Sequence, residues 1–195
     1  MKPINLYWFN RLGLEQLAPV ENEILSFLDK RIIAQHYEKG NLITAPGLSL
    51  GKIGFIRQGL VKGYYKIEGA EIVNWISCSN EVVAPSRVFI QKPDVEYIQA
   101  IEQTTIDYLK FTDIVEASER FKAFRLLRIK LIEEYFVLAE LRALIARIPN
   151  AKGRIRYFKQ HYFQPHFERV PKKDIASFLG ITPETLSRLY SKIEV

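Results

Sequence analysis

The 195-residue sequence contains very little cysteine, methionine or histidine, with one Cys, one Met and three His. A single thiol, Cys78, cannot form an internal disulfide, and one cysteine is too few for a structural zinc site or an iron–sulfur cluster. No run of about 18 apolar residues occurs, so no membrane span is expected. The first stretch, MKPINLYWFNRLGLEQL, lacks a continuous apolar core, so no signal peptide is expected. These absences favour a cytoplasmic protein without a membrane partner.

The scarcity of histidine also bears on catalysis. Metalloenzymes built on β-barrels of the cupin type need clustered histidines and a carboxylate along their strands. His36, His161 and His166 all lie outside the β-rich stretch from 40 to 112. No glycine-rich phosphate loop of the Walker type and no convincing Ser/His/Asp set is present. We therefore expect a protein that is not an enzyme and that holds no metal.

Acidic residues are scarce in the carboxyl-terminal part of the chain. Residues 118–195 hold 16 Lys and Arg against 8 Asp and Glu, whereas residues 1–117 hold 12 against 14. Such an asymmetry suggests an acidic partner for the basic part, and nucleic acid is the commonest one. An ordinary basic, solvated surface is the alternative.

The amino-terminal part divides into a helical and a β-rich stretch. Apolar residues at helical spacing predict helix over 12–38. From 40 to 112 the chain consists of short segments rich in Val, Ile, Tyr and Phe, separated by Gly or Pro. This pattern predicts strands of a β-sandwich, jelly roll or small barrel. KIEGAEIV predicts a hairpin with its turn at Glu68-Gly69-Ala70.

Residues 118–148 are predicted to form one long helix. Apolar residues follow one side of it, and a second set that includes Ile132 and Phe136 follows another. A helix with two apolar faces can pack against its own domain and against a second subunit. A single core helix in a monomer is the alternative. We expect a homodimer, with an interface containing Leu127, Leu131, Tyr135, Leu138 and Ile145.

The segment IASFLGITPETLSRLY, from Ile175 to Tyr190, predicts two short helices joined by a tight turn. Gly180 suits the turn, Thr182 suits an N-cap, and Pro183 suits the first position of the second helix. Apolar residues at helical spacing give the second helix a buried face. This layout is that of a helix-turn-helix whose second helix enters the major groove of DNA.

The polar residues on the other face of that second helix suit DNA. Arginine can donate to O6 and N7 of guanine, and glutamate can accept from N4 of cytosine. Glu184 and Arg188 are four residues apart and therefore share a face. A surface ion pair, worth a few tenths of a kcal/mol, is the alternative. Phosphate contacts are predicted for Thr185, Ser187, Lys172, Lys173, Lys192 and basic residues of 152–169.

The stretch DIASFLGITPETLSRLYSKI resembles the helix-turn-helix of the cyclic-AMP receptor/fumarate–nitrate regulator (Crp/Fnr) superfamily. The shared pattern is Ile-Ala, two residues, Leu-Gly, then Thr-x-Glu-Thr-x-Ser-Arg. The order of elements along most of the chain resembles that family too. The resemblance implies an α+β fold. A cyclic-nucleotide-binding-like β-roll (jelly roll) with amino-terminal helices would span 1–117, a dimerisation helix 118–148, and a winged-helix-like DNA-binding domain 149–195.

The resemblance also implies residue roles. Glu184 and Arg188 would contact bases, and Thr182 and Thr185 would contact phosphate. Pro183 stands where many family members have an arginine that reads a further base, so altered or looser specificity is expected.

Cyclic AMP is not expected to bind. Relatives that bind it carry Gly-Glu for the ribose and an Arg-Ser/Thr pair for the cyclic phosphate. Here Asn80-Glu81 replaces the first pair, and Val95-Glu96-Tyr97 stands where the arginine belongs. A carboxylate there would repel a phosphate. No cofactor is therefore expected, and another small effector, or none, stays open. A retained pocket is predicted near Glu81, Ser86, Arg87 and Glu96.

Together these features predict a DNA-binding transcription regulator. It would be a homodimer that reads an inverted repeat in double-stranded DNA through a recognition helix at 183–192, with RNA polymerase as a further candidate partner. The alternative is a β-roll that serves as a ligand-binding or protein-interaction module and no longer binds DNA.

Overall fold

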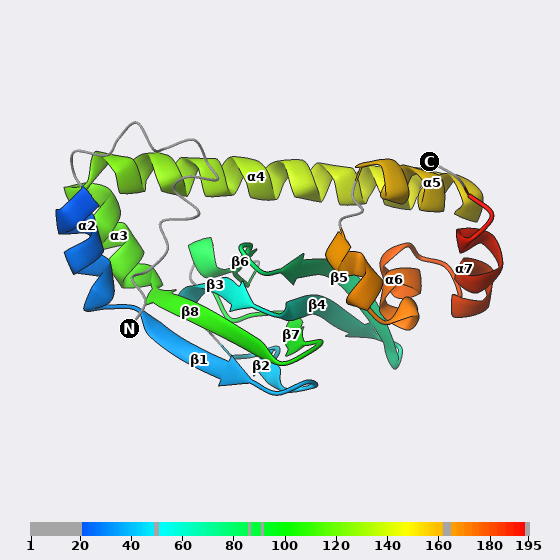
Figure 1. Ribbon diagram of the computed structural model, residues 1–195, viewed down its shortest axis with the longest axis horizontal. Coiled ribbons are helices and arrows are strands. Elements are labelled where there is room, and N and C mark those ends of the chain that lie inside the picture. The colour runs from blue at the N-terminus through cyan, green and yellow to red at the C-terminus, as the bar shows by residue number, and fades with distance from the viewer. Residues whose placement is uncertain (1–20, 49–50, 86, 91, 162–164, 194–195) are drawn as a thin grey trace.

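The computed structural model describes residues 21–48, 51–85, 87–90, 92–161 and 165–193. A β-roll lies beside one long helix, α4 (Lys122–Arg147), which runs along the length of the molecule (Figure 1). Helices α2 (Glu21–Asp29) and α3 (Phe111–Arg120) pack at one end. Helices α5 (Ala151–His161), α6 (Lys172–Phe178) and α7 (Pro183–Tyr190) lie at the other end, and we use the name carboxyl-terminal half for these three helices and the segments between them. The predicted α+β fold, with its β-roll, long helix and helix-turn-helix, is confirmed.

The β-roll consists of two four-stranded antiparallel sheets, in the orders β1-β8-β3-β6 and β2-β7-β4-β5. Apolar residues that point inward from both sheets form the core between them. The strands are β1 (Ile33–Tyr37), β2 (Leu42–Thr44), β3 (Lys52–Gln58), β4 (Leu60–Ile67), β5 (Ala70–Cys78), β6 (Val82–Val83), β7 (Tyr97–Ala100) and β8 (Thr104–Lys110).

Strands β4 and β5 form the predicted hairpin. Ile67 pairs with Ala70, so Glu68 and Gly69 alone form the turn. Their φ angles are 51° and 83°. Two left-handed residues give a turn whose twist matches that of the flanking strands. The sequence therefore located this hairpin correctly, with Ala70 already the first residue of β5.

The helix predicted over 12–38 is only partly present. Residues 12–20 lie outside the described residues, and α2 ends at Asp29. Residues 33–37 form strand β1 instead, which pairs with β8 in the register Ile33 to Tyr108. The helical prediction was wrong there because the backbone hydrogen bonds of β1 come from a strand about seventy residues further along the chain.

The long helix is confirmed as α4, but a separate helix precedes it. Helix α3 includes residues 111–112 of the predicted β-rich stretch and residues 118–120 of the predicted long helix, and Phe121 separates it from α4 with an extended backbone, φ −119° and ψ 120°. The Phe121 ring is buried edge-on against Phe27 of α2, with ring centroids 5.6 Å apart. The break therefore lets one aromatic side chain fill the core that α2, α3 and α4 share with the β-roll.

The carboxyl-terminal half shares a hydrophobic core with the β-roll. Tyr64 and Val73 of the β4–β5 hairpin pack in the same cluster as Phe158 of α5 and Ile175 of α6. Helix α6 lies directly against β5 (Figure 1). Among the described residues, no helix is long and apolar enough to cross a membrane. The β-roll and the carboxyl-terminal helices are thus packed together rather than joined only by α4.

Candidate nucleic-acid interface

The turn between α6 and α7 is built from a helix stop followed by a helix start. Gly180 has a φ of 61°, and the N–H groups of Gly180 and Ile181 donate to the carbonyls of Ser177 and Ala176, both at 3.0 Å. These two hydrogen bonds close the end of α6 as a Schellman motif, which favours glycine at the left-handed position. Thr182 Oγ1 then accepts the N–H of Thr185 at 3.2 Å, and Pro183 is the first residue of α7.

Helix α7 has one buried and one exposed face. Leu186 is buried against α6 and α5, and Leu189 is half-buried. Glu184, Ser187 and Arg188 are exposed, and Thr185 is half-buried at the edge between the faces. The helix lies at one extreme of the molecule, beyond the carboxyl end of α4 (Figure 1). Its exposed face is therefore not covered by any described part of its own chain.

Glu184 is held as a carboxylate at the amino end of α7. Its own backbone N–H and then the Thr182 hydroxyl bond to it, and these bonds lower the pKa of Glu184. No ion pair joins Glu184 to Arg188 in the described part of the chain. The arrangement leaves an acceptor and a guanidinium side by side on one exposed helix face, which is what direct reading of base edges needs.

The three lysines predicted to contact phosphate are all exposed. Lys172 and Lys173 begin α6, and Lys192 follows the end of α7. Lys172 and Lys173 precede α7 in the sequence and Lys192 follows it, and an exposed ammonium group can approach a phosphate backbone.

Two other basic residues hold the helix-turn-helix together. Arg154 of α5 donates to the carbonyl of Ile148 at 2.9 Å and to those of Leu179 and Gly180 at 3.0 and 2.9 Å. Lys159 donates to the carbonyls of Tyr190 and Ile193 at 2.9 and 2.8 Å. Sequence reasoning grouped both with the phosphate-attracting residues of 152–169. Their positions, five residues apart on α5, gave no signal of this common role in capping helix ends.

A buried ion pair docks α6 onto the β-roll. Lys62 of β4 lies 2.8 Å from Asp174 of α6 and 3.2 Å from Glu71 of β5. Burial alone would favour the neutral amine, but the hydrogen bonds and charges of Asp174 and Glu71 outweigh it and raise the pKa of Lys62. Ser177 completes the dock, because its hydroxyl donates to the Glu71 carbonyl at 2.7 Å and accepts the Val73 N–H at 3.0 Å. Sequence reasoning missed this contact entirely.

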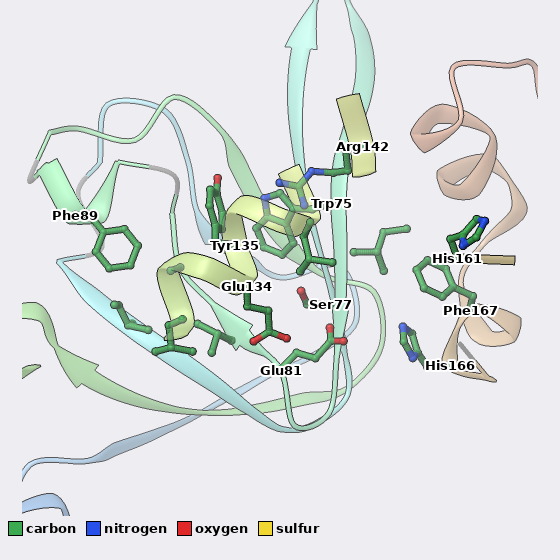
Figure 2. A pocket seen from close by; sticks show the side chains of 16 residues that line it. Trp75, Ser77, Glu81, Phe89, Glu134, Tyr135, Arg142, His161, His166 and Phe167 are labelled. Atoms are coloured by element: carbon green, nitrogen blue, oxygen red, sulfur yellow. The ribbon is translucent and has the colours of Figure 1, made fainter. Parts of the chain in front are cut away.

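A cavity of about 280 Å³ lies at the junction of the β-roll, α4 and the carboxyl-terminal half (Figure 2). We call it the junction cavity. Its wall is mostly apolar and aromatic, with Trp75 from β5, Tyr135 from α4 and Phe167 from the 3-10 turn Pro165–Arg169. The polar residues of the wall are Ser77, Glu81, Glu134, Arg142, His161 and His166.

The four residues predicted to mark an effector pocket have different positions. Glu81 lies on the wall of the junction cavity and accepts the Cys78 N–H at 2.9 Å. Glu96 is fully buried behind the wall and accepts the indole N–H of Trp75 at 2.9 Å. Arg87 is half-buried and does not line the cavity. Ser86 lies outside the described residues. The structure thus brings together Glu81 and, through Trp75, Glu96.

The two apolar faces of α4 have separate environments. Of the residues predicted for the dimer interface, Leu127 and Ile145 are buried within the subunit, and Leu131, Tyr135 and Leu138 line the junction cavity. Tyr135 lines that cavity and is still 40% exposed. Besides Tyr135, the apolar residues of α4 that remain exposed are Ile129, Ile132, Phe136, Val137 and Leu144. We call these five residues the α4 stripe. Sequence analysis recognised both faces, and its assignment of the first face to a second subunit stays a prediction.

Comparison with known proteins identifies the fold. No protein-family model matches the sequence, and no curated protein sequence matches it. FixK2 from Bradyrhizobium japonicum has a TM-score of 0.69 and 20% identity, covering 83% of each chain. A CooA variant from Carboxydothermus hydrogenoformans has a TM-score of 0.69 and 21% identity, covering 84% of this chain and 76% of that one.

A third solved structure carries the family's name. This Eubacterium rectale protein, assigned to the Crp/Fnr family of transcriptional regulators, has a TM-score of 0.67 and 16% identity, covering 89% of this chain and 85% of that one. A β-roll, a long helix and a carboxyl-terminal helix-turn-helix thus define the class to which the chain is similar. The fold is that of the Crp/Fnr regulators, which confirms the resemblance found in the sequence.

Proposed function

We propose that the chain is a DNA-binding transcription regulator whose helix α7 reads base pairs in the major groove. The observation that carries this proposal is the outer face of α7. Glu184, Ser187 and Arg188 are exposed there, while Leu186 anchors the opposite face in the core. A capped helix with acceptor and guanidinium groups on one free face suits recognition of cytosine and guanine. The fold shared with transcription regulators supports the same function.

The regulator would act as a homodimer paired along the α4 stripe. Phe136 is 68% exposed, and Ile132 is 44% exposed on the same helix. A contiguous exposed apolar surface of this kind favours contact with another molecule. Because α7 lies beyond the carboxyl end of α4, a two-fold axis that runs beside and parallel to α4 would bring two copies of α7 to the same end of the dimer. Half-sites of an inverted repeat about one helical turn apart would fit them.

Lysines around α7 would supply the part of the affinity that does not depend on sequence. Lys172, Lys173 and Lys192 are exposed, and they belong to residues 118–195, which hold 16 Lys and Arg against 8 Asp and Glu. Each lysine that neutralises a phosphate releases counterions, so binding would weaken steeply with salt. An effector other than cyclic AMP would occupy the junction cavity, whose wall includes Glu81.

Selection of bound duplexes from a random DNA pool tests the proposal. Wild-type protein should enrich an inverted repeat, and Arg188→Ala should lose the preference for guanine at one position of each half-site. Arg156→Ala is the matched control, because Arg156 is an exposed arginine on α5 that lies outside the helix-turn-helix. Failure of the wild type to enrich any sequence would favour the ligand-binding or protein-interaction module instead.

A further inference from the structure

Arg154 of α5 connects two helix ends that belong to different parts of the chain. Its Nε donates to the carbonyl of Ile148, the C-cap of α4, at 2.9 Å. Its Nη1 donates to the carbonyls of Leu179 and Gly180, at 3.0 and 2.9 Å, where α6 ends. The carbonyl end of a helix carries partial negative charge, and a guanidinium presents several donors in one rigid plane. One side chain therefore ties the end of α4 to the end of α6.

The backbone around Arg154 is itself held against the end of α4. Asn150 Oδ1 accepts the N–H of Gly153 at 2.7 Å, at the start of α5. A methyl group at Gly153 would lie 2.8 Å from the Ile148 side chain, so α5 approaches the end of α4 closely there. The joint between α4 and α5 is therefore tightly packed, and the Arg154 side chain extends from a fixed position to the helix-turn-helix.

Helix α6 is held at its two ends by different parts of the chain. Its first turn is docked on the β-roll by the buried contact between Asp174 and Lys62, at 2.8 Å. Its carbonyl end is held by Arg154. Thr182, the N-cap of α7, follows Gly180 by two residues, so the contact with Arg154 lies beside the start of the recognition helix. Without Arg154, α6 and α7 would be free to pivot about the Lys62–Asp174 contact.

We propose that Arg154 is a positioning residue that fixes α7 relative to α4, and thereby sets the distance between the two half-sites of the DNA site. This inference rests on the proposed function, because two copies paired along α4 would hold their α7 helices at a separation fixed by the position of α7 on α4. The role of Arg154 is geometric. It needs no contact between phosphate and the guanidinium, which three carbonyls already engage.

The distance between two nitroxide labels tests the positioning without DNA and without a partner copy. The labels are placed at Lys39→Cys on the β-roll and Ser187→Cys on the exposed face of α7, in a Cys78→Ser background, and labelled chains are diluted into unlabelled ones. The β-roll shares a hydrophobic core with α4, so the first label also reports the position of α4. Arg154→Met should broaden the distance distribution from double electron–electron resonance about twofold, because the bonds that fix the end of α6 are lost.

Two variants separate position from charge and from general loosening. Arg154→Lys keeps the charge, but one ammonium cannot span the ends of α4 and α6, so it should broaden the distribution as Arg154→Met does. Lys159→Met removes the bonds to the Tyr190 and Ile193 carbonyls, which hold only α7 to α5, and should leave the width unchanged. An unchanged width in either Arg154 variant, or equal broadening in Lys159→Met, would overturn the proposal.

A series of duplexes tests the consequence for DNA. The half-sites of the enriched inverted repeat are moved together or apart by one base pair, which changes their separation by about 3.4 Å. Wild type should prefer the original spacing about tenfold, whereas Arg154→Lys should bind the three spacings within about threefold. Equal preference in both proteins would overturn the role in spacing. Wild-type protein that binds none of the duplexes would contradict the proposed function, and the label distances would still decide whether Arg154 positions α7.

Discussion

The ammonium group of Lys62 on β4 lies 2.8 Å from the carboxylate of Asp174 on α6, and the two side chains are 5% and 7% exposed. A buried ion pair adds little net stability, because both charges lose their hydration. Its geometry is nevertheless restrictive, since neither charge tolerates burial without the other. The pair therefore fixes where the helix-turn-helix sits on the β-roll.

Removal of one partner should be costly. Asp174→Ala leaves the Lys62 ammonium buried with only the half-exposed Glu71 beside it, so the free energy of unfolding should fall by about 3 kcal/mol. Urea denaturation measures this. Lys130→Gln is the control, because the Lys130–Glu133 pair on α4 is exposed, at 51% and 57%, and should contribute less than about 1 kcal/mol. Equal losses in the two variants would show that the Lys62–Asp174 contact is not buried in solution.

The pH dependence of stability should depend on His166. Burial and the charge of Arg169 lower its pKa in the folded state, so below an ordinary value of 6.5 the unfolded chain binds more protons. The free energy of unfolding is therefore undiminished by His166 above pH 6.5, and it falls as the pH drops through the lowered folded-state pKa of His166. Between pH 8 and 5 the wild type should lose more free energy of unfolding than His166→Gln. Parallel curves would mean that His166 is solvated.

Gly63 should be required for the position of Trp75. A methyl group at Gly63 would overlap the indole ring, which forms part of the junction cavity. Gly63→Ala should therefore cost about 1–3 kcal/mol through overpacking and should shift the Trp75 emission in a Trp8→Phe background. Gly69→Asn is the matched control, because that turn position is open and asparagine tolerates its φ of 83°. An unchanged emission in Gly63→Ala would contradict the packing of the Trp75 indole against Gly63.

The α4 stripe should determine the oligomeric state. Ile132→Asp combined with Phe136→Asp places two charges on exposed apolar positions, so sedimentation should show monomers with unchanged circular dichroism. Ile72→Asp changes an isoleucine of similar exposure on β5 and should leave the dimer intact. A wild-type protein that sediments as a monomer at micromolar concentration would contradict the proposed pairing.

Local signals in the sequence predicted the elements that depend on local chemistry. The turn at Gly180, the cap at Thr182 and the hairpin at Glu68-Gly69 each follow from the backbone needs of two or three adjacent residues. Helix α4 follows from apolar spacing over many turns. These parts of the fold and the face of α7 were therefore visible in the sequence alone.

Features that depend on distant partners were not predictable in the same way. Strand β1 exists because β8 pairs with it, and Lys62 is buried because Asp174, more than a hundred residues later, neutralises it. The face of α4 that covers the β-roll and the face that stays exposed have equally apolar residues, so spacing alone could not assign them. The junction cavity likewise needs His166 and Trp75 to meet in space.

The measurement closest to the central claim is a cycle between Arg188 and one guanine. Equilibrium binding is measured for wild type and Arg188→Ala, on the enriched duplex and on a duplex in which that guanine is replaced. Arg188→Ala should lose about 1–3 kcal/mol of binding free energy on the first duplex and almost nothing on the second. Equal losses on both duplexes would show that Arg188 contributes only charge, and would contradict base reading by α7.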